Sequence, residues 1–326
     1  MNVLTIYPNC SLGGMTSVYV NRCIDQPNDT FSFIFLGDKG GKEAFTVLPN
    51  THTRIVRKDR LNNYLDFSVA KVKYDEIRIT SIPSLPKIIK EKCDSKVIYE
   101  FHTSSLDIIN RELEELSLEY VDEIWVPSDY LKSIIESSLV SKLLVKVVRN
   151  LANKNIFNIN PTAKIKYNFP INEIPIFWIG RFDKGKNYKD FFRVLSLLDE
   201  KYIGYIVLSM ENDAERYSEA LGELAIYNLA DRVKFFLNLT QQEIADLYKN
   251  SASVNGMFCS TSLAESFGYG VLEAAMAGIP VVAYDVGGLS EHLEYGYDIK
   301  MVNVGDTVAL SNEIIRIQDK GVSNIG

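Results

Sequence analysis

The residues best suited to chemistry lie in one short stretch, Glu265-Ser-Phe-Gly-Tyr-Gly-Val-Leu-Glu273. Gly268 and Gly270 fall in the first turns of an expected amphipathic helix, where each glycine costs about 1 kcal/mol relative to alanine. We infer that backbone amides approach a ligand there, because the amides and partial positive charge of a helix start suit a phosphate. The carboxylates of Glu265 and Glu273 can accept hydrogen bonds from sugar or ribose hydroxyls. A phosphate beside a polyol indicates a nucleotide sugar, and a solvated helix face is the alternative.

A second candidate segment is the glycine turn after the apolar strand expected over Val281–Tyr284. The backbone amides around Gly287 and Gly288, together with Leu289, would touch the phosphates or the sugar of such a ligand. Glu291 stands just beyond the turn, where its carboxylate would orient the loop.

A third segment, Ile179–Asn187, follows a buried strand and combines glycines with cations. Arg181 would supply a bidentate fork and Lys186 a point charge, a combination that suits a pyrophosphate. The alternative is a surface loop with ordinary solubilising charges.

Two candidates lie in the first half of the chain. Gly13 and Gly14 separate the first expected strand from the first expected helix, and without side chains they can bring amides close to a ligand. His102 comes directly after the strand expected over Val97–Glu100, at the strand end where ligands of open parallel sheets bind. The alternatives are a plain glycine turn and a structural histidine.

These motifs together resemble the retaining GT-B glycosyltransferases known as group 1 or GT4. Glu265 and Glu273 match the two glutamates of that family's Glu-x7-Glu region, and Gly287-Gly288 with Glu291 match its Gly-Gly-x-x-Glu stretch. The resemblance covers the whole second half of the chain, and the first half only through scattered landmarks. It implies a GT-B fold, in which two Rossmann-like domains face a cleft that holds the active site.

The resemblance also implies a role for each candidate residue. Glu265 would contact the hydroxyls of the donor sugar and Glu273 the ribose, while Arg181 and Lys186 would bind the diphosphate. His102 would face the donor sugar. Gly13-Gly14 would lie near the donor phosphate and the acceptor, and Gly268 would contribute to donor binding. The implied activity is retaining transfer of a sugar, of the hexosyltransferase type, from a nucleotide donor to an acceptor hydroxyl. UDP is the expected nucleotide and bacterial-type glycan or glycoconjugate synthesis the expected setting.

The order of elements favours an α/β fold, because apolar runs of strand length alternate with helical periods. We expect a first domain over residues 1–152, an irregular Asn-rich connector over 153–172 and a second domain over 173–326. Strands are predicted at Val3–Tyr7, Phe31–Leu36, Glu76–Ser81, Val97–Glu100, Glu123–Val126, Leu143–Val148, Ile176–Ile179, Ile203–Ser209, Val233–Phe236, Ala252–Met257 and Val281–Tyr284. Helices are predicted at Met15–Cys23, Leu106–Leu118, Tyr130–Glu136, Lys189–Leu198, Glu215–Tyr227, Gln241–Tyr248 and Phe267–Ala277. Thr240-Gln-Gln-Glu243 reads as a capping box.

Composition excludes several classes of protein. The 326 residues are 46% hydrophobic and 24% charged, as in ordinary globular proteins. Residues 1–155 hold 20 Lys and Arg against 20 Asp and Glu, so the net charge of −7 falls on the remainder. A nucleic-acid binder would need a basic face, so no nucleic-acid partner is expected. The four cysteines have no paired spacing, which favours a reducing cytoplasm over a disulfide framework or a zinc site.

Two absences bear on mechanism. No aspartates stand at i and i+2, so the Asp-x-Asp metal motif of the other major glycosyltransferase fold is missing, and no Cys/His cluster is present. We therefore expect an enzyme without a metal or other cofactor, in which Arg181, Lys186 and helix amides neutralise the leaving diphosphate. The alternatives are a non-catalytic GT-B-like partner that binds glycan and a nucleotide-sugar epimerase.

The acceptor is not specified, and a glycan, a lipid-linked sugar or a protein all fit. Ile82–Lys96 carries Lys87, Lys90, Lys92 and Lys96 near apolar residues, which would suit contact with anionic lipid. An ordinary surface helix is the alternative. No apolar run approaches the ~20 residues of a membrane span, and the start at Met1 reads as a strand and not a signal peptide. A cytoplasmic protein is expected, peripheral to the inner membrane face if the lysines contact lipid.

Overall fold

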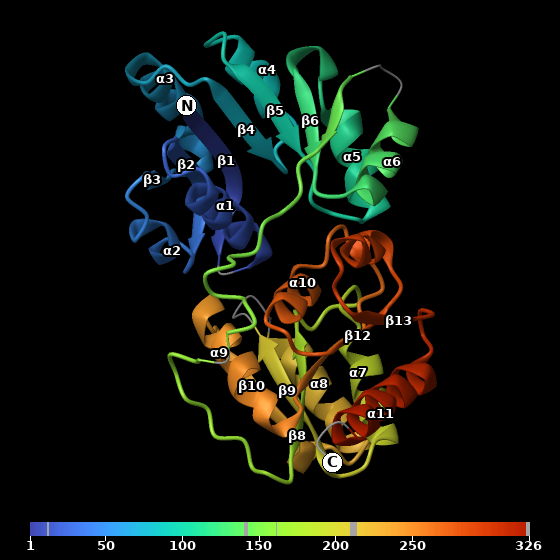
Figure 1. Cartoon of the computed structure of the whole chain (residues 1–326). Helices are drawn as coiled ribbons and strands as arrows, with labels where there is room; N and C mark the ends of the chain where they lie inside the picture. The colour runs from blue at the N-terminus through green and yellow to red at the C-terminus, as the bar shows by residue number, and fades with distance from the viewer. Residues whose placement is uncertain (12, 140–142, 161, 209–213, 324–326) are drawn as a thin grey trace. The chain divides into compact units, whose positions relative to one another are not determined.

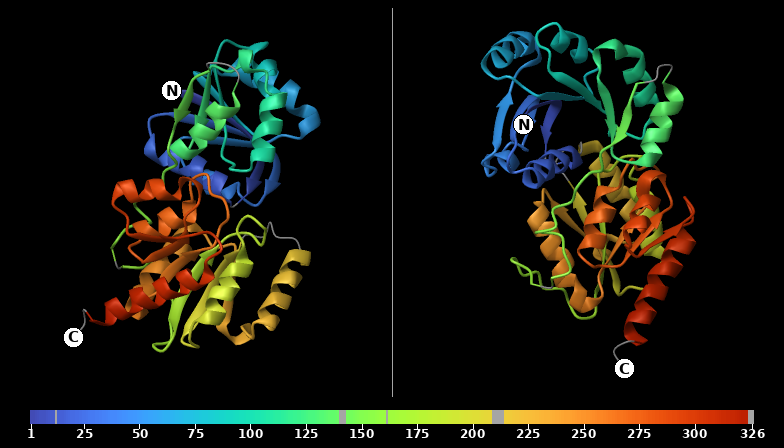
Figure 2. Two further views of the ribbon diagram at one scale, coloured as in Figure 1. Left: turned by 90° about the vertical axis from the view of Figure 1, so that its right-hand side faces the viewer. Right: turned by 45° about the horizontal axis from the view of Figure 1, so that its top comes forward.

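The computed structural model describes residues 1–11, 13–139, 143–160, 162–208 and 214–323. The chain forms two compact units, Met1–Leu151 and Ala152–Gly326, each built on one sheet of parallel strands (Figure 1). Helices lie on both faces of each sheet (Figure 2). The predicted α/β class with two Rossmann-like halves is therefore confirmed.

The N-terminal unit has a seven-stranded sheet in the order β3-β2-β1-β4-β5-β6-β7. Its strands are β1 Asn2–Ser11, β2 Thr30–Lys39, β3 Thr51–Ile55, β4 Glu76–Thr80, β5 Lys96–Glu100, β6 Glu123–Val126 and β7 Val145–Val147. Its helices are α1 Gly14–Asp25, α2 Glu43–Thr46, α3 Leu61–Lys71, α4 Leu85–Lys90, α5 Leu106–Glu115 and α6 Asp129–Ser138, with 3₁₀ turns η1 Lys58–Arg60 and η2 Leu118–Tyr120.

The two faces of this sheet bury different side chains, because successive residues of a strand point to opposite faces. One face presents aliphatic residues such as Leu4, Ile6 and Ile77, which pack under α3, α4, α5 and α6. On the other face Phe33 contacts Phe45 of α2 and Tyr19 of α1, with ring centroids 4.6 and 5.7 Å apart. Burial on both faces accounts for the nearly continuous apolar strands of the sequence.

The C-terminal unit has a six-stranded sheet in the order β10-β9-β8-β11-β12-β13. Its strands are β8 Ile174–Ile179, β9 Tyr202–Leu208, β10 Val233–Leu237, β11 Met257–Ser260, β12 Val281–Tyr284 and β13 Ile299–Val302. Its helices are α7 Tyr188–Leu197, α8 Ala214–Ile226, α9 Gln241–Ser251, α10 Tyr269–Met276 and α11 Thr307–Ser323, with 3₁₀ helices η3 Ala230–Arg232, η4 Ala252–Val254 and η5 Gly287–Tyr295.

The segment expected to connect the domains packs onto the C-terminal unit. Phe157 is fully buried in that unit's core. The buried Asp246 of α9 accepts hydrogen bonds from the backbone amides of Lys164 and Ile165, at 3.2 and 3.0 Å. The described residues of this segment form no helix or strand, and α9 supplies part of their backbone hydrogen bonds.

The predicted elements agree with most of the structure, including β12 and the capping box at Thr240. The strand predicted over Ala252–Met257 is wrong. Residues Ala252–Val254 form η4, Asn255 turns the chain with φ 56°, and β11 begins only at Met257. Ser209, the predicted end of the strand that begins at Ile203, lies outside the described residues.

Among the elements that were not predicted are β3, α2 and α3 in the first half and β13 and α11 in the second. Two of the strands, β3 and β13, are edge strands whose residues are mostly half-buried or exposed, so their sequences lack the apolar run of the central strands. The stretch Ile82–Lys96 is not one helix, because α4 ends at Lys90 and β5 begins at Lys96.

Candidate functional site

Three predicted segments of the C-terminal unit meet at one edge of its sheet. The loops after β8, β11 and β12 carry Lys186, Glu265 and Gly288, and these three strands are neighbours in a parallel sheet. The Nζ of Lys186 lies 2.5 Å from Oε1 of Glu265, and the amide of Gly288 donates to the carbonyl of Glu265 at 3.0 Å. The expected diphosphate cation and the expected sugar-binding carboxylate are therefore direct neighbours.

The loop that carries Arg181 and Lys186 is organised around Asp183. One carboxylate oxygen of Asp183 accepts from the Nε of Arg181 at 3.0 Å, and the other accepts from the backbone amide of Lys186 at 2.8 Å. The side chain of Arg181 is 56% exposed. Asp183 thus holds the side chain of Arg181 and the backbone of Lys186.

The next residues tie this loop to the β11 loop. The hydroxyl of Thr261 donates to the carbonyl of Asn187 at 2.9 Å and accepts from Nε1 of Trp178 at 3.1 Å. The amide of Leu263 donates to the carbonyl of Gly185 at 2.8 Å. Asn187 adopts φ 51°, in the left-handed region, and its backbone begins α7. The spacing between Lys186 and Glu265 is therefore set by backbone and buried side chains.

Gly268 has a structural reason to be glycine that the sequence did not show. Its φ is 81°, and a Cβ atom there would lie 1.9 Å from Cδ2 of Leu289. Leu289 itself is fully buried. Any contact between Leu289 and a ligand would therefore come from its backbone, while its side chain fixes the start of α10 against η5.

Glu273 lies in the second turn of α10 and is 6% exposed. Its Oε1 accepts a hydrogen bond from Nε2 of Gln241, at the start of α9, at 3.1 Å. Burial raises the pKa of the Glu273 carboxyl to about 8, although the bond from Gln241 acts in the opposite direction. Sequence reasoning missed Gln241, because the pairing of two helices leaves no local signal.

A buried histidine, His292, lies on η5. It is 1% exposed, its Nε2 lies 2.6 Å from the carbonyl of Phe267, and its ring meets that of Phe267 edge to face at 4.8 Å. His292 thus holds the segment that precedes α10. Its neighbour Glu291 is half-buried on η5, beside the turn that it was expected to orient.

In the N-terminal unit, Gly13 precedes α1 and Gly14 is its first residue. Neither has a positive φ, and a Cβ atom on Gly14 would meet no atom within 4 Å. The backbone therefore does not require glycine at Gly14. Space is left at the start of the helix, as expected for a site where a ligand approaches the amides.

His102 follows β5 and is held by a buried ion pair. Its Nε2 lies 2.8 Å from Oε2 of Glu100, and Glu100 lies 2.8 and 2.9 Å from Nη1 of Arg22. Burial alone would raise the pKa of Glu100, but Arg22 and the hydrogen bond from His102 outweigh it and hold that pKa well below its ordinary value. Glu100 is a charged residue in an apolar strand, a signal that could have identified it.

The site residues fall into two sets, each within one unit. The C-terminal unit holds Arg181, Lys186, Gly268, Glu265, Glu273, Leu289 and Glu291. The N-terminal unit holds Gly13, Gly14 and His102. In both units the residues follow the carboxyl ends of parallel strands, where open α/β sheets bind ligands.

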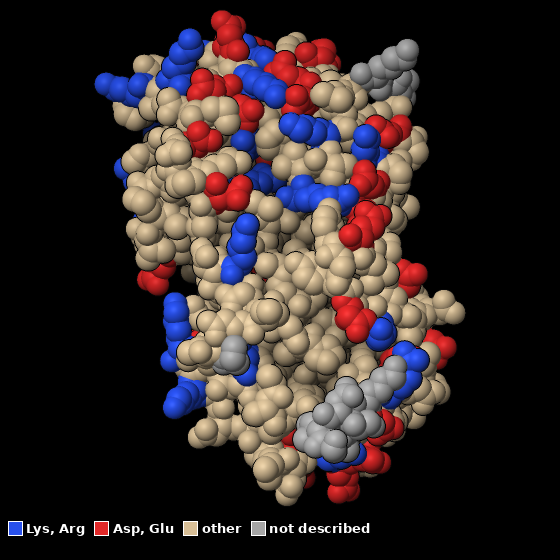
Figure 3. Space-filling view, viewed as in Figure 1, with Lys and Arg blue, Asp and Glu red and all other residues tan. Residues whose placement is uncertain are grey.

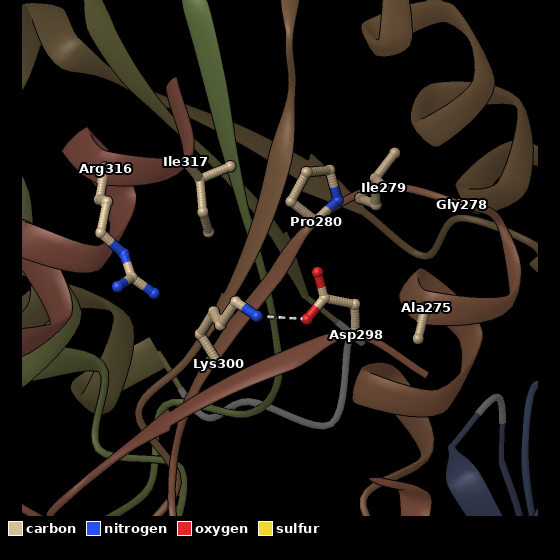
Figure 4. A pocket seen from close by; sticks show the side chains of 8 residues that line it. All are labelled: Ala275, Gly278, Ile279, Pro280, Asp298, Lys300, Arg316 and Ile317. Carbon is tan, nitrogen blue, oxygen red and sulfur yellow. Dashed lines mark hydrogen bonds and ion pairs between the residues drawn. The ribbon is translucent and has the colours of Figure 1, made fainter. Parts of the chain in front are cut away.

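A cavity of about 350 Å³ in the C-terminal unit lies elsewhere (Figure 4). Gly278, Ile279 and Pro280 precede β12 and Asp298 precedes β13, so this cavity opens at the amino ends of the strands. Lys300 forms an ion pair with Asp298 at 2.5 Å. The cavity is therefore separate from the glycine turns and the cations of the candidate site.

Comparison with known proteins identifies the family. Residues 160–321, nearly the whole C-terminal unit, match the family described as Glycosyl transferases group 1. The chain belongs to the group 1 glycosyltransferases. Its fold is GT-B: the structure is similar to that of Anabaena Alr3699/HepE in complex with UDP and glucose, with a TM-score of 0.80 at 16% identity over 97% of this chain and 89% of that one.

Two relatives show how far the sequence similarity extends. A probable sucrose-phosphate synthase of Thermosipho melanesiensis is 30% identical over 147 residues, which are 44% of this chain and 33% of that protein. The chain thus spans about a third of that relative's length. An uncharacterized 41.2 kDa protein in the cps region of Klebsiella pneumoniae is 24% identical over 349 residues, 98% of this chain and 89% of that protein.

The burial of Glu273 predicts a pH-dependent stability. A carboxyl group with a raised pKa holds its proton more tightly in the folded state, so its contribution to stability is full below the unfolded value of 4.5 and is lost as the pH rises toward 8. Glu273→Gln removes this titration. As the pH rises from about 5 to about 8.5, the melting temperature of the variant minus that of the wild type should increase by about 3 °C or more. Such a shift corresponds to roughly 1 kcal/mol in a domain of this size.

Thermal unfolding followed by circular dichroism at a series of pH values measures this gain. The exposed Glu294→Gln is the matched control and should keep a constant difference from the wild type. A difference for Glu273→Gln that is equally constant would show that Glu273 does not titrate as its burial requires.

Proposed function

We propose that the protein is a retaining glycosyltransferase that moves a sugar from a UDP-linked donor to an acceptor hydroxyl. The observation that carries this proposal is the 2.5 Å contact between Lys186 and Glu265. It brings a cation suited to the diphosphate beside a carboxylate suited to sugar hydroxyls, as the two parts of a nucleotide sugar require. UDP as the nucleotide is supported by the similar Anabaena structure, which is a complex with UDP and glucose.

In the proposed reaction the bond between the anomeric carbon and the diphosphate oxygen breaks, and its electron pair leaves with UDP. Arg181 and Lys186 stabilise the negative charge that develops on the diphosphate, so their effect is larger in the transition state than in the bound donor. The acceptor oxygen bonds to the anomeric carbon on the same face, and its proton passes to the leaving diphosphate. Glu265 and His102 would hold the transferred sugar, and Glu273 the ribose.

We propose that the protein acts in the cytoplasm, as its cysteines suggest. Cys10, Cys23, Cys93 and Cys259 are all free thiols, which suits a reducing compartment. In the described part of the chain no helix is long and apolar enough to cross a bilayer.

Contact of Ile82–Lys96 with lipid loses support in the structure. Lys90 pairs with Asp122 at 2.7 Å, Lys96 with Glu123 at 2.9 Å, and Lys92 with Asp66. Three of the four lysines that suggested a basic face therefore face carboxylates. These pairs favour the alternative reading of this stretch as ordinary surface.

Removal of either diphosphate cation tests the proposed activity. Arg181→Ala and Lys186→Ala should each lower kcat/KM roughly 10²-fold or more, because loss of one transition-state donor typically costs about 3 kcal/mol. The measurement is UDP release with a panel of UDP-sugars and acceptors. Lys184→Ala, which removes an exposed lysine of the same loop, is the matched control and should retain the wild-type rate. Wild-type rates in both Arg181→Ala and Lys186→Ala would rule out this site.

Chelation tests the proposal that no metal is required. Arg181, Lys186 and the amides at the start of α10 supply the positive charge that a divalent ion would otherwise give the leaving diphosphate. The initial rate should therefore stay within about twofold of the untreated rate in excess EDTA. Loss of activity in EDTA that Mg²⁺ or Mn²⁺ restores would contradict metal independence.

A further inference from the structure

The outer edge of the N-terminal sheet carries a groove that takes no part in the proposed reaction. On the face covered by α3, Ser32 of β2 pairs in register with His52 of β3, and Ile34 with Arg54. These residues line one side of a cavity of about 180 Å³, and Tyr64, Phe67 and Lys71 of α3 line the other. None of the residues that line the cavity is acidic.

The surface around this groove is positively charged although the whole chain carries −7. Residues 51–73, here called the edge strip, contain six cations and two acids: Arg54, Arg57, Lys58, Arg60, Lys71 and Lys73 against Asp59 and Asp66. Both acids are already engaged, Asp59 with Arg57 at 2.9 Å and Asp66 with Lys92 outside the strip. Figure 3 shows Lys and Arg side chains on the surface over α3, at the upper left of the view.

Four cations of the edge strip remain available for a partner. Among the described residues, no carboxylate lies within 4.0 Å of the side-chain nitrogens of Arg54, Lys58, Lys71 or Lys73. All four residues are exposed. This distinguishes the edge strip from Ile82–Lys96, where three of the lysines are paired.

Large apolar side chains stand among these cations. Phe67 is 57% exposed, and Ile55 and Val72 are each 36% exposed. Phe67 and Lys71 lie four residues apart on α3, so they are neighbours on one face of the helix. An exposed aromatic ring beside cations matches the two contributions that hold proteins at a bilayer surface, apolar insertion at the headgroup level and attraction to anionic lipid.

We propose that the edge strip is a docking surface for an anionic lipid bilayer, with Phe67 inserted among the headgroups and Arg54 and Lys71 bound to lipid phosphates in and beside the groove. Charge complementarity selects this occupant, because the groove offers cations and no acid, and the exposed apolar residues favour a bilayer over a purely ionic partner. The proposal does not depend on the proposed glycosyltransferase activity, because no residue of the edge strip belongs to the candidate site.

Co-sedimentation with vesicles tests the proposal. The full chain should bind vesicles of equal parts phosphatidylglycerol and phosphatidylcholine, and should bind phosphatidylcholine alone at least roughly tenfold more weakly. Arg54→Gln/Lys71→Gln should lower the partition coefficient about 25-fold, since each cation at an anionic surface contributes about fivefold. Phe67→Ser should lower it about tenfold, by the loss of inserted apolar surface. Binding should fall in about 0.5 M NaCl, which screens the charges.

Matched variants on the same unit control for lost charge and lost apolar area. Lys39→Gln/Lys42→Gln removes two exposed lysines, and Val47→Ser removes a side chain that is 79% exposed. Both should bind like the wild type, and unchanged melting temperatures would show that every variant is folded. The proposal is overturned if the wild type does not bind anionic vesicles at low salt, or if the controls lose as much binding as the edge-strip variants. Binding of a nucleic acid or an acidic protein to the edge strip, without any binding to vesicles, would assign the strip to that other class of partner.

Discussion

The candidate site depends on the ion pair between Lys186 and Glu265, because this contact joins two loops that are 79 residues apart in sequence. Two opposite charges at 2.5 Å stabilise each other strongly where water is partly excluded, and both side chains are largely covered. In the proposed function a nucleotide sugar would take over this contact, with its diphosphate at Lys186 and its hydroxyls at Glu265. The ligand would replace one set of charge-assisted hydrogen bonds by another, so neither charge would be left unpaired during binding.

The parallel sheet makes the contact between Lys186 and Glu265 possible, and hydrogen bonds and packing around the two loops fix its geometry. Because β8, β11 and β12 are adjacent and parallel, their following loops must emerge side by side. Asp183 then fixes Arg181 and the amide of Lys186, while the left-handed Gly268 accommodates Leu289. In the N-terminal unit the same edge is organised by ion pairing, where Arg22 neutralises Glu100 and Glu100 holds His102. In both units a carboxylate holds a residue suited to ligand contact, Asp183 holding Arg181 and Glu100 holding His102.

Much of the fold and many candidate site residues could be predicted from the sequence, and the elements and contacts that could not be predicted have physical reasons. Central strands such as β12 were correct because burial on both faces leaves a continuous apolar run. Arg181, Lys186 and Glu265 could be proposed as site residues because their loops resemble a family pattern. The edge strand β3 lacks such a run, and the turn at Asn255 displaced the predicted start of β11. The sequence did not point to Gln241, His292 or Asp183, because their contacts are tertiary or depend on loop geometry, which spacing does not reveal.

The most direct test of the account is a crystal structure of the protein with UDP. The account predicts that the diphosphate lies within hydrogen-bonding distance of the terminal nitrogens of Arg181 and of Nζ of Lys186, with the ribose hydroxyls at Glu273. The Lys186–Glu265 contact should then be shared with the diphosphate or broken by it. UDP bound elsewhere on the chain, with the loop from Gly180 to Asn187 empty and the ion pair unchanged, would contradict the assignment of this edge as the donor site.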